Sequence, residues 1–197
     1  MFGYKWLFAL PLLFGGCGYR FDGEATEEGR ITLSIPYVNG DPDGLLTDEL
    51  IRQCSASGVF EYMRDGGEYS LQVNVVKDEN HRIGFRYDRN DTTGAVKSNL
   101  IPIEFRRVVA AEVMFVHCPT GEIAFGPEVV TGSGEYDTVN PSAVTDLTFI
   151  NPLGVREKVI QFSLGQLDTP EGGQDNVRVP LYRDLAQIIV DGIVNTL

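Results

Sequence analysis

A turn near residue 40 carries oxygen-bearing side chains at the spacing of a calcium loop. Asn39, Asp41 and Asp43 alternate with other residues and Gly44 follows, which imitates the start of an EF-hand. The twelfth position of such a loop requires Glu, and here it is Leu50. We therefore interpret the segment as a turn that starts a helix, and we expect no metal site.

The rest of the sequence lacks a recognisable catalytic set. It has no Gly-x-Ser-x-Gly elbow, no His-Glu-x-x-His motif and no glycine-rich phosphate loop. The two histidines, His81 and His117, form no assignable pair with a nucleophile, and Cys118 beside His117 supplies too few metal ligands. We expect a protein that is not an enzyme and needs no cofactor, with an enzyme of unrecognised site as an alternative.

Cys17 follows a segment typical of a secretory signal. Residues 1–16 hold one positive side chain, Lys5, then an apolar run, then two glycines directly before the cysteine. The apolar run, Trp6 to Phe14, has nine residues, whereas a membrane-spanning helix needs roughly 20. Leu13-Phe14-Gly15-Gly16-Cys17 loosely matches a bacterial lipobox. We therefore expect a signal peptide over 1–16 and acylation of the Cys17 thiol after cleavage.

Residues 17–30 are expected to form a lipidated tether. One acyl chain binds a membrane only marginally, so stable anchoring takes two signals. A lipoprotein cysteine provides more than one chain, palmitate among them. The residue after the cysteine is Gly18 and not Asp, the residue that would favour retention of a lipoprotein at the inner membrane. We expect a lipid-anchored protein on the periplasmic side of the cell outer membrane.

Basic residues gather in one stretch of an acidic chain. The net charge is −12, and −13 without residues 1–16, which disfavours a nucleic-acid partner. Residues 77–107 hold seven of the sixteen Lys and Arg residues against five acids. Arginine forks suit phosphate groups. The candidate ligand-binding residues are therefore Arg82, Arg86, Arg106 and Arg107, unless they only pair with acids across a solvated hairpin.

Hydrophobic patterning predicts one α+β domain over residues 31–197. The expected strands cover 31–37, 69–75, 82–88, 103–117, 122–125 and 128–136. One expected helix runs from 45 to 57, with Asp43 as its N-terminal cap, and a second runs from 181 to the C-terminus. We expect a two-layer sandwich, a mostly antiparallel or mixed sheet of four to five strands with two main helices on one face.

Residues 137–177 do not fit this plan. They hold three prolines and several glycines, and are longer than an ordinary connection. We interpret them as an irregular insertion in the domain. The sequence also leaves open whether Cys54 and Cys118 form a disulfide.

Several short motifs follow one another behind the lipobox. They are Cys17-Gly18-Tyr19-x-Phe21, Ile31-x-Leu-x-Ile-Pro, Gly40-Asp-Pro-Asp-Gly-Leu-Leu-Thr-Asp-Glu-Leu, Gly58-Val59-Phe60, Tyr69-x-Leu-x-Val and Asp184-Leu-Ala-x-Ile-Ile-Val. In this order they resemble the LptE-type lipopolysaccharide-assembly lipoprotein family, over most of 17–136 and over 181–197. The segment 137–177 departs from the family, in which the last strand leads more directly to the helix.

The resemblance implies a function that composition alone does not. It implies an α/β sandwich tethered to the outer membrane, in complex with a β-barrel of the LptD type that inserts lipopolysaccharide. It also implies that the lipoprotein itself binds lipopolysaccharide. The alternative is a structural lipoprotein of another envelope complex that has no contact with lipopolysaccharide.

Overall fold

The computed structural model describes residues 29–90, 93–139, 148–158 and 168–197. Its strands are β1 (Ile31–Ser34), β2 (Phe60–Met63), β3 (Tyr69–Arg89), β4 (Val96–His117), β5 (Glu122–Asp137), β6 (Thr148–Ile150) and β7 (Arg156–Lys158). Its helices are α1 (Leu45–Ala56), α2 (Pro170–Asn176) and α3 (Arg178–Val194).

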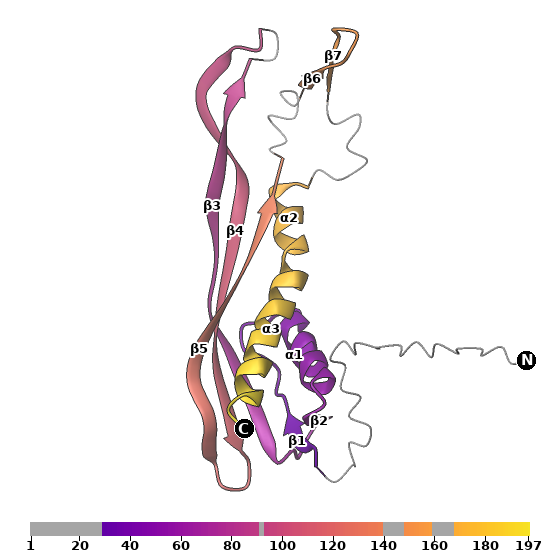
Figure 1. Cartoon of the computed structure of the whole chain (residues 1–197). Helices are drawn as coiled ribbons and strands as arrows, with labels where there is room; N and C mark the ends of the chain where they lie inside the picture. Colours follow the sequence, from indigo (N-terminus) through magenta and orange to yellow (C-terminus); the bar gives the residue numbers. More distant parts are fainter. Residues whose placement is uncertain (1–28, 91–92, 140–147, 159–167) are drawn as a thin grey trace, which may run out of the picture.

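The main sheet has five strands in the order β2-β1-β3-β4-β5. β1 is parallel to both β2 and β3, whereas β3, β4 and β5 form an antiparallel meander. α1 and α3 pack against each other and cover one side of this sheet (Figure 1). The expected α+β sandwich, with a mixed five-stranded sheet and two main helices, is confirmed.

The core lies at the end of the molecule where both helices meet the sheet. Leu46 and Leu50 from α1 and Leu185 and Ile189 from α3 are fully buried against sheet residues such as Phe115. Both helices present apolar residues at helical spacing, so their burial follows directly from the sequence pattern. No residue between 76 and 108 that the structure describes belongs to this core cluster.

β3 is one strand of 21 residues. The prediction of two separate strands at 69–75 and 82–88 was therefore wrong. Between them the polar run from Lys77 to His81 shows no alternation of apolar and polar residues. The pairing with β4 nevertheless continues from Lys77, opposite Ala110, to Arg82, opposite Phe105. Here the neighbouring strand, rather than a hydrophobic face, keeps the chain extended.

The start of α1 also differs from expectation. Its N-cap is Gly44, in a left-handed conformation with φ 74°, and it makes no side-chain cap. The buried Asp41 accepts hydrogen bonds from the backbone N–H of Thr47 at 2.9 Å and from its hydroxyl at 3.1 Å. Asp43, the expected cap, instead forms an ion pair with Arg178 on α3. The turn therefore contacts both helices, α1 through Asp41 and α3 through Asp43.

The far part of the β3–β4 pair extends well beyond the core. β5 pairs with β4 only from Glu104 to His117, and β1 pairs with β3 only at Tyr69 and Ser70. Residues 82–103, here named the distal hairpin, thus form a two-stranded ribbon within the described residues. At about 3.3 Å per residue, a strand as long as β3 covers roughly 65 Å, and Figure 1 shows the resulting rod.

The segment 137–177 contributes α2 and the small β6–β7 hairpin in its described parts. β6 and β7 pair from Thr148, opposite Lys158, to Ile150, opposite Arg156. The guanidinium of Arg156 lies beside Gly94 in the turn of the distal hairpin. The β6–β7 hairpin therefore lies at the far end of the rod, away from the core (Figure 1).

Candidate functional site

Cys17 and the expected signal peptide lie outside the described residues. Acylation at Cys17 therefore stays a prediction from the sequence. In the part of the chain that is described, no helix combines the length and apolar character needed to cross a membrane.

Arg107 is buried between the sheet and the helices. Its Nε and Nη2 donate to the two carboxylate oxygens of Asp78 at 2.8 and 2.6 Å, and its Nη1 donates to the carbonyl of Gln174 on α2 at 3.2 Å. The hydrogen bonds from Arg107 to Asp78 raise the pKa of the guanidinium further above its usual range. The side chain thus fastens α2 to β3 and β4.

Arg106 points to the opposite side of the sheet, because successive side chains of a strand alternate between faces. Its Nε donates to the Glu135 carboxylate on β5 at 2.9 Å. Both side chains are largely exposed, at 46% and 60%. This is a surface ion pair, which contributes little to stability.

Arg82 and Arg86 lie on the distal hairpin. They pair with Phe105 and Ile101 of β4, and two register shifts interrupt the pairing between them. Arg82 is exposed and makes no ion pair with a described residue, whereas Arg86 is half-buried.

The four arginines therefore form no single cluster. Arg107 and Arg106 occupy opposite faces and have carboxylate partners, Asp78 and Glu135. The sequence could have predicted that Arg106 and Arg107 lie on opposite faces, because both fall in the expected strand over 103–117 and neighbouring side chains of a strand alternate between faces. Their role in ligand binding stays a prediction.

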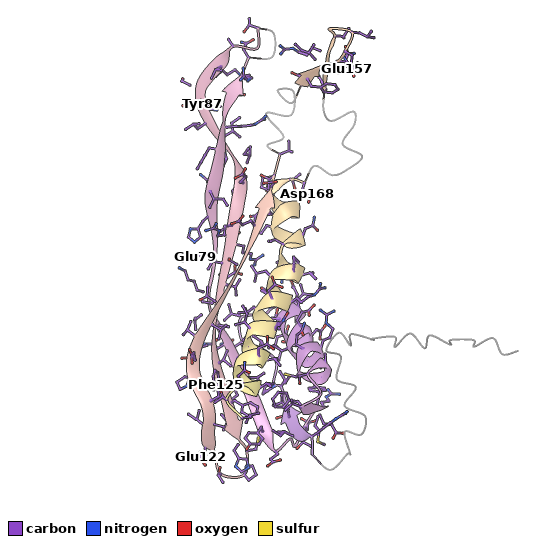
Figure 2. The ribbon with its side chains drawn as sticks, viewed as in Figure 1. Glu79, Tyr87, Glu122, Phe125, Glu157 and Asp168 are labelled. Atoms are coloured by element: carbon purple, nitrogen blue, oxygen red, sulfur yellow. The ribbon has the colours of Figure 1, made fainter. Side chains whose placement is uncertain are left out.

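Exposed apolar side chains at the far end of the rod are a feature that the sequence analysis missed. In the distal hairpin, large hydrophobic side chains that are 39–58% exposed are Ile83, Phe85, Tyr87, Val96 and Leu100. Figure 2 labels Tyr87 near the end of this hairpin, and Glu157 of β7 to the side of that end. The sequence does contain these apolar residues within its basic stretch. Only the structure shows that they lie on a two-stranded ribbon, where no other described element covers their side chains.

Charged groups lie beside these apolar residues. Lys97 donates to the Asp88 carboxylate at 3.1 Å, and this hydrogen bond lowers the pKa of Asp88. Arg89 donates through Nη1 to the carbonyl of Gly94 at 3.1 Å, and no carboxylate of a described residue forms an ion pair with it. The distal hairpin thus combines apolar and cationic side chains.

The two remaining cysteines are both free, Cys54 buried and Cys118 exposed. Burial raises the pKa of the Cys54 thiol to about 12, so it stays protonated at neutral pH. Among the described residues, no three His, Cys, Asp or Glu side chains lie close enough together to hold a metal ion. A hollow of about 480 Å³ on the sheet face away from the helices is lined by residues including Tyr37, Gln72 and Met114.

No protein family profile matches the chain, and no curated protein sequence matches it. Several solved structures are similar in outline. A putative lipoprotein from Caulobacter crescentus has 12% identity and a TM-score of 0.47, covering 83% of this chain and 88% of that one. A minor lipoprotein from Acinetobacter baumannii has 15% identity and a TM-score of 0.44, covering 84% and 93%. Rare lipoprotein B from Shewanella oneidensis has 12% identity and a TM-score of 0.42, covering 84% and 92%. At these identities and TM-scores, the likenesses assign no function to this chain.

Proposed function

We propose that the protein is an envelope lipoprotein, anchored through acylated Cys17 on the periplasmic side of the cell outer membrane. There it partners a β-barrel of the LptD type and serves lipopolysaccharide assembly. One observation carries the proposal: a lipobox cysteine precedes an ordered series of LptE-like motifs.

These motifs fall at positions that build the sandwich. The turn from Gly40 to Gly44 supplies Asp41, which holds the first turn of α1, and Asp43, which pairs with α3. Leu71 and Val73 of the Tyr69 motif are buried on the helix side of β3. Leu185 and Ile189 of the last motif pack on the same core. The resemblance thus rests on residues that determine how the helices sit on the sheet.

Contact with lipopolysaccharide is assigned to Arg82 among the four candidate arginines. Arg107 is committed to Asp78 and Gln174, and Arg106 to Glu135. Arg82 is exposed at the base of the distal hairpin, where an arginine fork can reach a phosphate.

The test is affinity purification of the full-length protein from envelopes in mild detergent. We expect a β-barrel protein to co-purify, and we expect depletion of the lipoprotein to reduce surface lipopolysaccharide. Cys17→Ser is the matched control, which should lose both metabolic labelling with palmitate and fractionation with the outer membrane.

A lone monomer in every extract, together with unchanged surface lipopolysaccharide after depletion, would contradict the assignment. Recovery of a different envelope complex, again with unchanged lipopolysaccharide, would favour the structural-lipoprotein alternative. Persistent palmitate labelling of Cys17→Ser would refute the anchor itself.

A further inference from the structure

We propose that the distal hairpin docks onto the surface of an anionic lipid bilayer, with Phe85, Tyr87 and Leu100 at the depth of the headgroups. This goes beyond the proposed function, because neither lipopolysaccharide nor a barrel takes part in the contact.

The apolar residues form one face of the hairpin. Tyr87 pairs directly with Leu100, and Phe85, opposite Pro102, lies two residues along the same strand. Their exposed fractions are 58%, 52% and 52% for Tyr87, Leu100 and Phe85. An exposed apolar group of this kind, rimmed by charged residues, marks a contact surface for a membrane or a partner.

The charge distribution selects an anionic surface. Residues 82–103 contain four basic and two acidic side chains, a net charge of +2 in a chain of net charge −12. An anionic bilayer attracts basic segments close to its surface. The same field repels the acidic remainder of the chain, so the rod should approach with its hairpin first.

The strand edges determine how deep the contact goes. β3 beyond Val76 has β4 as its only described strand partner, and residues 96–102 of β4 pair with no other described strand than β3. Unpaired backbone groups do not enter the hydrocarbon of a bilayer. The hairpin therefore stays at the interface, the depth that tyrosine favours.

A lipid surface fits these residues better than an added protein strand. Strand addition binds through main-chain groups at a sheet edge, whereas the apolar side chains of the hairpin project from its face. An isolated two-stranded hairpin is at best marginally stable in water. Contact of its apolar face with lipid would stabilise it without any further protein.

The experiment uses the mature chain, residues 17–197, with Cys17→Ser so that no acyl chain contributes to binding. It is mixed with vesicles of phosphatidylglycerol and phosphatidylcholine, or of phosphatidylcholine alone, and binding is measured by flotation. We expect partition to fall at least tenfold without phosphatidylglycerol, and also in high salt.

The variant Phe85→Ser with Leu100→Ser should also lose at least tenfold in partition. Ile123→Ser with Val129→Ser is the matched control, because these residues are 48% and 58% exposed on β5 but lie outside the hairpin. Figure 2 shows the neighbouring Glu122 and Phe125 at the opposite end of the rod. This control should bind like the parent chain.

Tyr87→Trp adds a direct reading of depth. Trp6 is the only tryptophan of the chain, so the mature variant has a single reporter. Its emission should shift to the blue on vesicle binding and be quenched by lipids brominated near the headgroup.

No binding to phosphatidylglycerol vesicles, equal losses in the two double variants, or unshifted emission on bound vesicles would each overturn the proposal. The vesicles contain no lipopolysaccharide, so such a result leaves the proposed function standing. Conversely, failure to recover a barrel leaves the vesicle result unaffected.

Discussion

Arg106 and Arg107 are adjacent in sequence but differ in surroundings. The Arg107 side chain is 8% exposed and bound to Asp78 and Gln174, whereas the Arg106 side chain is 46% exposed and bound to Glu135. Removing one partner of a buried ion pair leaves the other charge uncompensated. Removing one partner of an exposed pair returns the other to water at little cost.

We therefore predict that Arg107→Met lowers the free energy of unfolding by about 3 kcal/mol. This is the lower end of the range for broken buried pairs, because Asp78 is itself 36% exposed. Arg106→Met, the matched control, should lower it by less than about 1 kcal/mol. Urea unfolding followed by circular dichroism measures both free energies. Similar decreases for the two variants would show that the buried Arg107 contributes no more to stability than the exposed Arg106.

The candidate site could be predicted from sequence only in part. The number of arginines and their location between residues 77 and 107 were evident. Their faces followed from the strand period, but their partners did not, because Gln174 lies 67 residues from Arg107 along the chain. Similarly, the pairing of Asp43 with Arg178 joins distant elements, so local rules assigned Asp43 to a cap.

At the scale of elements, glycines allow α3 to lie close to β5. Gly132 and Gly134 pair with Val109 and Arg107, so they face the helices. A Cβ at Gly134 would lie 2.5 Å from the Cγ2 of Val177, and one at Gly132 would lie 3.2 Å from the Cβ of Leu185. The absent side chains therefore set the distance between the sheet and the helix.

We predict that Gly134→Ala destabilises the protein by about 1–3 kcal/mol, the usual cost of overpacking a well-packed site. Gly29→Ala is the matched control, because nothing lies within 4 Å of the added carbon, and it should leave the free energy of unfolding unchanged. The measurement is thermal and urea unfolding of both variants. An unaffected Gly134→Ala would mean that α3 can shift away from β5 without loss.

The two main helices were predictable because each carries a complete apolar stripe. The strand β2 was missed because its four residues, Phe60–Met63, are too few to show a period. The full length of β3 was missed for another reason: Asp78 faces the helix side, where Arg107 satisfies it. A polar residue at an inward position interrupts the pattern although it does not interrupt the strand.

At the scale of the whole molecule, the core and the distal hairpin are separate parts of one sheet. Since no described residue between 76 and 108 belongs to the core cluster, the hairpin should be removable. We predict that replacing residues 83–104 with an Asn-Gly turn, which keeps Arg82 opposite Phe105, changes the free energy of unfolding by less than about 1 kcal/mol.

The shortened chain should at the same time lose binding to anionic vesicles. Urea unfolding and vesicle flotation on the same preparation test both parts of the prediction. A shortened chain that fails to fold would show that the hairpin contributes to the core after all.

The ribbon form of the hairpin has a consequence for its reach. Adding two residues to each strand would lengthen it by about 7 Å, and every existing side chain would keep its face. Adding one residue instead would turn the rest of that strand over. The core lies outside the hairpin. The distance from the core to the hairpin turn can therefore change in steps of two residues per strand, while the helices and their ion pairs stay unchanged.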